Sequence, residues 1–171
     1  MKLRPMQAKR IIAVIVLLVV AFLIVFPPLA NGGVRVTLSS SPPVNADRVN
    51  VTIGEISAHR IDISGPSAWQ TISNESILVD LTAANMNEMI AVGSLPLGQY
   101  ETIRVRVTNA TAVVNGTSRR VQLESSVFTI AAPFLIRFGT ETLIILKVAP
   151  EVQPTTDGVN LKLTFTGTPS S

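Results

Sequence analysis

The stretch Tyr100-Glu-Thr-Ile-Arg-Val-Arg-Val-Thr108 alternates between two kinds of side chain. One series is branched and apolar: Ile103, Val105 and Val107. The other series carries hydroxyl or guanidinium groups: Tyr100, Thr102, Arg104, Arg106 and Thr108. Successive side chains of a β-strand point to opposite faces, so this period of two predicts a strand with one buried side and one side in water.

Segments with a similar pattern lie on both sides of this stretch. A period close to two and many branched residues predict further strands at residues 34–38, 49–63, 69–72, 77–81, 128–137, 142–148 and 159–165. The phase of the pattern changes near Gly54-Glu55, which predicts a β-bulge there.

Two turns are expected from glycine positions. Asn115-Gly116 separates the branched segments 112–114 and 120–123. Asparagine and glycine accept the positive φ of a type I′ turn, so these segments are predicted to form a tight hairpin. Around Gly139, strands 128–137 and 142–148 are expected to form a second antiparallel pair.

Only residues 82–92 have a helical spacing of apolar residues, at Ala83, Met86, Met89 and Ile90. The sequence therefore predicts a mainly β protein: a single antiparallel β-sandwich, Ig-like or prealbumin-like, with one short helix. Its expected limits are residues 33–167, followed by a tail at 168–171.

The N-terminal region has a different character. Residues 11–26 are sixteen consecutive apolar residues, and residues 1–10 carry four basic side chains and no acid. A helix over this run is about 24 Å long, and uncharged residues 27–30 extend it towards the roughly 30 Å of a bilayer core. We expect residues 11–30 to be a transmembrane signal anchor, with residues 1–10 cytoplasmic and the sandwich outside.

Two competing interpretations of this segment are open. A cleaved signal peptide would end in a small-x-small site, and the best candidate is Pro28-Leu29-Ala30, where proline fits the first position poorly. A pilin-like leader would be cut on the cytoplasmic side so that the apolar helix packs into a filament core. Residues 7–11 lack a clear small residue just before the apolar run, where that cut would fall.

Charge and cysteine content exclude several kinds of partner. The chain has a formal net charge of +3, but residues 31–171 hold ten basic and eleven acidic residues, a balance of −1. No basic stripe with interleaved aromatics is present, so nucleic-acid binding is not expected. Cysteine is absent, which excludes disulfides, zinc-thiolate sites and a lipid-modified cysteine.

The residues that could support chemistry are few. The one histidine, His59, follows Glu55, but in an extended strand their side chains lie more than about 10 Å apart. Met86 and Met89 could offer thioethers to a soft metal such as Cu(I), although this spacing is more typical of a core-facing helix side. We therefore expect no catalytic residue, no metal site and no cofactor.

Four Asn-x-Ser/Thr sequons are candidate glycosylation sites: Asn50, Asn74, Asn109 and Asn115. Asn74 and Asn115 lie in expected turns and are favoured. Asn50 and Asn109 lie within or at the end of expected strands, where a glycan needs an outward face. Four sequons in a domain outside the membrane are typical of a surface glycoprotein, particularly in an archaeon or a eukaryote.

Several motifs resemble a β-sandwich family of bacterial and archaeal envelope proteins whose function is unknown. They are the Leu-Pro-x-Gly-x-Tyr corner at 95–100, the Glu-x-x-x-His strand at 55–59 and the Asn-Gly hairpin at 115–116, within matching stretches 34–42, 49–60, 95–107, 133–136, 143–146 and 161–163. The resemblance implies a sandwich in the envelope. Members often carry an acidic residue where this chain has Ser40, and many have a lipid-anchoring cysteine, which this chain lacks.

The expected function is that of a non-enzymatic, membrane-anchored envelope protein whose sandwich mediates interaction with another protein or with the surface layer. Such a protein would serve as an accessory subunit of a membrane or surface complex, and its oligomeric state is left open. A second hypothesis is a pilin-like filament subunit. A third is a carrier of a small ligand or metal that uses Met86, Met89 or His59.

Overall fold

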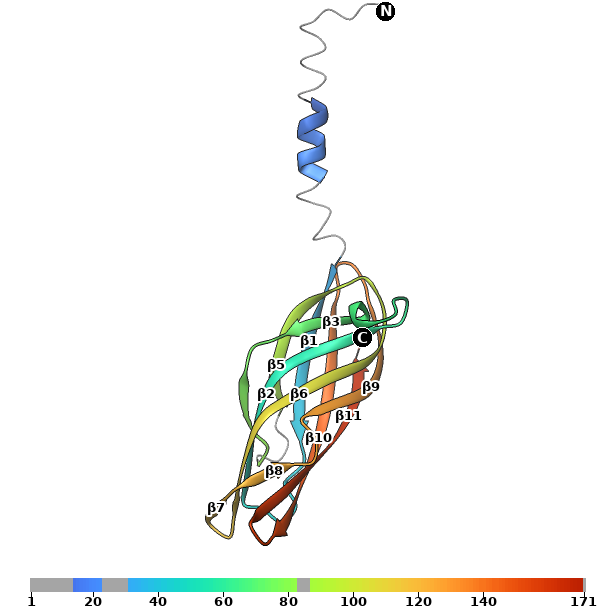
Figure 1. Ribbon diagram of the computed structural model, residues 1–171. Coiled ribbons are helices and arrows are strands. Elements are labelled where there is room, and N and C mark those ends of the chain that lie inside the picture. Colours follow the sequence, from blue (N-terminus) through green and yellow to red (C-terminus); the bar gives the residue numbers. More distant parts are fainter. Residues whose placement is uncertain (1–13, 23–30, 83–86, 171) are drawn as a thin grey trace, which may run out of the picture.

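The computed structural model describes residues 14–22, 31–82 and 87–170 of the chain (Figure 1). Residues 14–22 are helical, and strands dominate from Asn31 onwards. The strands are β1 (Asn31–Ser40), β2 (Arg48–Arg60), β3 (Trp69–Ser73), β4 (Ile77–Asp80), β5 (Asn87–Pro96), β6 (Gly98–Val114), β7 (Thr117–Arg119), β8 (Val121–Leu123), β9 (Val127–Ile136), β10 (Glu141–Thr155) and β11 (Gly158–Ser170), with a 3-10 helix η1 (Pro66–Ala68) before β3.

Two sheets pack face to face in an elongated sandwich (Figure 1). Sheet A has the order β5-β1-β10-β11-β8. In sheet B, β2 and β6 are the central pair, β3 and β4 pair with β2, and β7 and β9 pair with β6. The inward-facing apolar side chains of both sheets form one core. The prediction of a mainly β, sandwich-like fold is confirmed.

The two ends of the sandwich are named here for the N-terminal segment. The proximal end holds the start of β1 at Asn31 and the turn between β9 and β10 at residues 137–140. The distal end holds the loop 41–47 and the turns at 115–116 and 156–157.

The expectation of a wholly antiparallel sandwich is wrong for sheet A. β1 runs parallel to β10, and β8 runs parallel to β11. Parallel neighbours need a long connection between them. Here the chain passes through sheet B between β1 and β10, so the two strands start from the same end of the molecule.

The second predicted hairpin, around Gly139, is also wrong. β9 pairs with β6 in sheet B, whereas β10 pairs with β1 and β11 in sheet A. The chain therefore crosses from one sheet to the other at this turn. Both strands have one apolar face, and that pattern does not distinguish pairing within a sheet from packing across the core.

The predicted helix at 82–92 is wrong from Asn87 onwards, because β5 begins there. Ala83 and Met86 lie outside the described residues. A register shift against Val36 and Thr37 of β1 turns both Ile90 and Ala91 into the core. Two adjacent inward residues break the period of two, and the result resembles helical spacing.

The strand at 100–108 is confirmed within β6, with one exception. Ile103, Val105 and Val107 are buried as predicted, but Tyr100, which the pattern assigns to the solvent side, is only 2% exposed. A register shift against β9 between Tyr100 and Thr102 changes the phase. The bulge predicted near Gly54-Glu55 is confirmed by a register shift in β2.

The hairpin at Asn115-Gly116 is confirmed, with φ values of 51° and 69° that suit its tight turn. Its returning strand is β7, which begins earlier in the sequence than expected. β8, which covers most of the expected partner segment 120–123, leaves for sheet A and pairs with β11. The sandwich also extends beyond its expected limits, from Asn31 to Ser170, and residues 168–170 pair with β10.

Two glycines let the sheets approach at their edges. A Cβ at Gly93 of β5 would meet the carbonyl oxygen of Ile72 in β3. A Cβ at Gly167 of β11 would lie 2.9 Å from the Cβ of Ala132 in β9. Both distances are too short for a side chain. The two sheets therefore come into close contact at these two points, β3 with β5 and β9 with β11.

Candidate functional site

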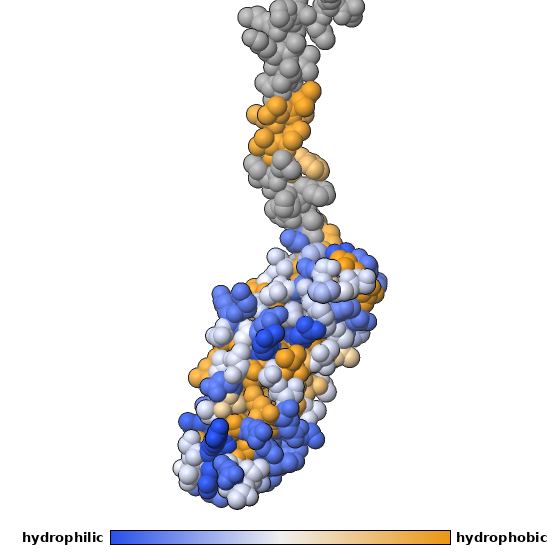
Figure 2. Space-filling model, in the orientation of Figure 1, coloured by the Kyte–Doolittle hydropathy of each residue, from blue (hydrophilic) through white to orange (hydrophobic). Residues whose placement is uncertain are grey.

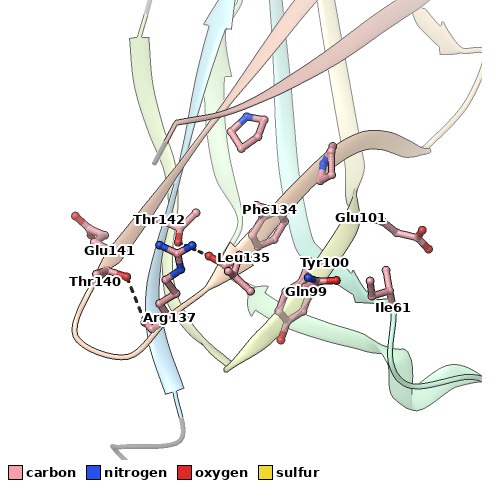
Figure 3. Close-up of a pocket in the computed structure, with 12 residues that line it drawn as sticks. Ile61, Gln99, Tyr100, Glu101, Phe134, Leu135, Arg137, Thr140, Glu141 and Thr142 are labelled. Carbon is pink, nitrogen blue, oxygen red and sulfur yellow. Dashed lines mark hydrogen bonds between the residues drawn. The ribbon is translucent and has the colours of Figure 1, made fainter.

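A groove of about 720 Å³ opens at the proximal end of the sandwich. Figure 3 shows it between the end of β9, the start of β10 and the sheet B residues around Tyr100. We call it the proximal groove. Its lining residues are Ile61, Gln99, Tyr100, Glu101, Pro133, Phe134, Leu135, Arg137, Thr140, Glu141, Thr142 and Pro169.

Two stacked aromatic rings form the rigid part of the groove. The Tyr100 and Phe134 rings lie 5.1 Å apart and are nearly parallel, at 8°. The Tyr100 hydroxyl donates a hydrogen bond to the carbonyl oxygen of Pro96, at 2.9 Å. Burial raises the pKa of Tyr100, so its phenol is neutral at physiological pH. The Leu-Pro-x-Gly-x-Tyr motif is therefore a structural corner, and it sets one wall of the groove.

The opposite wall is polar and comes from the turn between β9 and β10. Thr140 donates its hydroxyl to the Arg137 carbonyl oxygen, and Thr142 donates to that of Leu135, each at 3.3 Å. Glu141 forms an ion pair with Arg35 of β1, at 3.1 Å. These bonds fix the turn backbone while the Arg137 side chain stays exposed.

Beside the groove, on the outer face of sheet B, lies a cluster of His59, Trp69, Glu101 and Arg104, which we call the Trp69 cluster. The Arg104 guanidinium carbon lies 3.5 Å from the Trp69 ring centroid, and the His59 ring meets the same indole edge-on at 4.9 Å. His59 Nδ1 is 2.9 Å from Glu101 Oε1, at ion-pair distance, although the angle is not that of a hydrogen bond. Glu101 also lines the groove, so it joins the two features.

Arg60 and Asp62 stand at the same end. Arg60 donates two hydrogen bonds to the Asp62 carboxylate, at 2.6 and 2.7 Å. This bond lowers the pKa of Asp62 and raises that of Arg60. Both groups stay charged. The two hydrogen bonds between them hold the start of the loop that contains Ile61.

His59 and Glu55, which an extended strand is expected to hold apart, have different partners in the structure. Glu55 pairs with Arg106, at 3.4 Å, whereas His59 lies against Glu101. Met89 is 52% exposed and lines a second hollow of about 320 Å³ together with Asn74, whereas Met86 lies outside the described residues. Within residues 14–22, 31–82 and 87–170, no group of three or more His, Cys, Asp or Glu side chains could hold a metal ion.

The four sequons occupy different surroundings. Asn74 and Asn115 are exposed in turns, as expected, and Asn109 is exposed in β6, where its side-chain oxygen accepts a hydrogen bond from the Ala110 N–H. Asn50 is half-buried in β2, and its side-chain oxygen has no hydrogen-bond partner. Asn50 is therefore the least accessible of the four for a glycan.

Ser40 is buried and donates its hydroxyl to the Leu81 carbonyl oxygen, at 2.8 Å. This contact joins the end of β1 to the chain beyond β4. A serine here acts as a structural hydrogen-bond donor.

Sequence reasoning missed Trp69, Glu101 and the groove itself. These residues meet only because β2, β3 and β6 are neighbours in sheet B. One signal could have found them: the chain has a single histidine, a single tryptophan and a single tyrosine. All three lie in or beside the proximal groove.

The predicted anchor, residues 11–30, lies mostly outside the described residues. Its described part, 14–22, is helical, and its large apolar side chains are 48–70% exposed. Figure 2 shows this segment as uniformly hydrophobic, in contrast to the mixed surface of the sandwich. Among the described residues, no helix has the length and apolar character needed to span a bilayer.

Comparison with known proteins places the sandwich in a family. Neither a curated protein nor a solved structure matches the chain significantly. Residues 31–164, which run from the first residue of β1 into β11, match the family described as "Domain of unknown function (DUF4382)". The matched region covers strands of both sheets, the Trp69 cluster and every lining residue of the proximal groove except Pro169, and the chain therefore belongs to this family.

Proposed function

We propose that this protein is a non-enzymatic, membrane-anchored component of the cell envelope, and that its sandwich binds another envelope protein through the proximal groove. The observation that carries the proposal is the position of the groove. It opens at the end of the sandwich where the chain comes from the apolar segment.

The apolar segment supports anchoring. Residues 11–26 are uninterrupted apolar residues after a basic stretch, and the described side chains at 14–22 are largely exposed. An apolar helix with this exposure is unfavourable in water and favourable in lipid. The charge bias then directs residues 1–10 to the cytoplasm and the sandwich outwards.

The composition of the groove supports binding. Its stacked aromatic pair is held by a hydrogen bond, and both of its carboxylates, Glu101 and Glu141, lie at ion-pair distance from a basic partner. A rigid apolar wall facing a polar wall suits an extended polypeptide segment, which presents side chains and backbone groups together. A partner in the same membrane would reach this end first.

Site-directed photo-cross-linking in membranes of the source cell tests the proposal. A photoreactive residue at Gln99, inside the groove, is expected to yield a covalent product with one other envelope protein. Thr164, exposed on the outer face of β11, is the matched control and is expected to yield none. Equal products from the two positions, or none from Gln99, would contradict binding at the groove.

A small-ligand carrier is the second candidate, because the volume of the groove lies in the range of about 300–1,000 Å³ typical of small-molecule sites.

The N-terminus of the native protein distinguishes an anchor from a filament helix and from a cleaved signal peptide. An intact Met1 or Lys2 supports an anchor. A new terminus between Arg10 and Ile11 supports a pilin-like filament subunit, and one after Ala30 supports a secreted domain.

A further inference from the structure

Three apolar side chains are exposed at the proximal end. Phe138, in the turn between β9 and β10, is 57% exposed, and Ile61 and Leu135, which line the groove, are 47% and 39% exposed. At the distal end, the turns at 115–116 and 156–157 contain only Asn, Gly, Thr and Asp, and loop 41–47 exposes one large apolar side chain, Val44, at 54%. An exposed phenylalanine at the tip of a turn is unfavourable in water, and the turn itself requires only Gly139, which has a φ of 71°.

The Phe138 turn lies next to the start of β1. Gly33 pairs with Glu141, and a Cβ at Gly32 would meet the carbonyl oxygen of Arg137. From Asn31 back to Phe22, the last described residue of the helix, is nine Cα steps, which can span at most about 30 Å. The chain connection therefore keeps the turn that contains Phe138 close to the apolar segment.

The charge beside the tip suits a phosphate. Within the described part of the chain, Arg137 forms no ion pair, whereas its neighbour Glu141 pairs with Arg35. A guanidinium binds phosphate oxygens through paired N–H donors, and an aromatic ring next to a cation is favoured at the boundary between lipid headgroups and acyl chains.

The positions of the sequons fit the same orientation. Asn50 and Asn109 lie in the distal halves of β2 and β6, Asn115 forms the distal turn, and Asn74 lies about midway along the sandwich. The proximal end has none. Sites that could carry bulky hydrophilic glycans are thus kept away from the tip.

We propose that the proximal end rests on the membrane surface, with Phe138 at the level of the lipid headgroups and Arg137 on a lipid phosphate. This inference depends on the anchoring in the proposed function. It goes beyond anchoring because it fixes how the sandwich stands: the proximal groove lies at the height of the membrane surface and the distal turns point away. The ligand is the lipid surface itself.

Fluorescence of the full chain reconstituted into phosphatidylcholine vesicles, with and without brominated acyl chains, tests this orientation. Trp69→Phe removes the one native tryptophan. Phe138→Trp then reports on the proximal tip, and Thr117→Trp, in the distal hairpin, is the matched control. Brominated lipid is expected to quench the tryptophan at 138 strongly and the one at 117 hardly at all.

A second pair of variants controls for the preference of tryptophan itself for the membrane interface, because position 138 then carries no tryptophan. Ile61→Trp reports from the same end, and adding Phe138→Ser to it is expected to reduce quenching while Thr117→Ser leaves it unchanged. Unfolding of each variant in detergent verifies that the fold is kept.

The outcomes distinguish this orientation from the anchoring on which it depends. A chain that does not float with vesicles overturns both together. A chain that floats but shows no quenching at position 138, or equal quenching at both tips, overturns only the orientation. A third outcome is a tryptophan at position 138 that is shielded from water in native membranes but is not quenched by brominated lipid in vesicles. This result would mean that a protein partner covers the proximal end, and it would also overturn the lipid contact.

Discussion

At both ends of the sandwich the chain reverses its direction, but the side chains in the turns differ. At the distal end, Asn115 and Gly116 reverse the chain with positive φ values, and the Gly116 N–H donates to the Asp47 carboxylate, at 2.8 Å. At the proximal end, Gly139 makes the corresponding turn, but it is preceded by an exposed Arg137 and an exposed Phe138.

This difference separates the side chains that folding requires from those that it does not require. The distal residues are explained by turn chemistry and local hydrogen bonds. The proximal end has, in addition, a groove, a stacked aromatic pair and a Trp69 cluster, none of which a turn requires. The surplus of aromatic and charged groups at one end is what supports a binding role there.

The largest expected effect is a loss of stability on core substitution, and it tests whether the core is packed equally well at the two ends. Leu95→Ala removes a fully buried side chain near the proximal end, and Leu161→Ala removes one near the distal end. Each should lower the free energy of unfolding by about 2–5 kcal/mol, because a cavity is added to the lost burial. Denaturant unfolding followed by circular dichroism measures both. Equal losses would confine the difference between the ends to their surfaces, and a much smaller loss for Leu95→Ala would mean a loosely packed proximal core.

A medium effect is expected only at the proximal end. Tyr100→Phe removes the hydrogen bond to Pro96 and should cost about 1 kcal/mol at neutral pH. Burial raises the pKa of Tyr100 in the folded state, so the unfolded state loses its proton first as the pH rises above about 10. Stability should therefore fall in that range for the parent, and less steeply for Tyr100→Phe. Unfolding curves at several alkaline pH values measure this, and identical slopes would contradict a buried phenol.

The smallest expected effect lies in the distal half, at Asp80. Burial acts to raise its pKa, but hydrogen bonds from the Thr82 side chain and backbone, together with the charge of Arg48, outweigh burial and lower it. A lowered pKa stabilises the fold above the unfolded value of about 4 and loses that contribution as the pH falls further. Asp80→Asn should cost less than about 1 kcal/mol at neutral pH, because the carboxylate is half exposed. The difference from the parent should shrink as the pH falls below about 4 in acid unfolding curves. A difference that does not change with pH would contradict a contribution from the Asp80 charge.

The local sequence pattern is sufficient to predict most strands, but it does not predict which strands pair with each other. The alternation at Ile103, Val105 and Val107 predicts burial correctly because it depends only on the period of a strand. It fails at Tyr100 and Ile90, where bulges change the phase through contacts with another strand. The parallel pairing of β1 with β10 is a long-range choice, and nothing in either segment alone specifies it.

The candidate site is less accessible to prediction than the fold. The acidic residue considered with His59 from the sequence is Glu55, whereas the acidic contact of His59 in the structure is Glu101 on the adjacent strand. The Leu-Pro-x-Gly-x-Tyr motif does identify the corner at Tyr100, but not the groove that this corner helps to line. A groove arises from the distance between two sheets, which single-strand periodicity does not contain.

The position of β1 within sheet A has a mechanical consequence. β1 is the strand that connects to the N-terminal segment, and it is central: it pairs with β10 from Gly33 to Ser40 and with β5 from Asn31 to Ser39. A pull on the tether along β1 loads both ladders in shear, so many hydrogen bonds must break together. A pull at right angles to the strands would instead break the bonds one at a time. Pairing on both sides of β1 should therefore raise the force that is needed to unfold the sandwich through this strand.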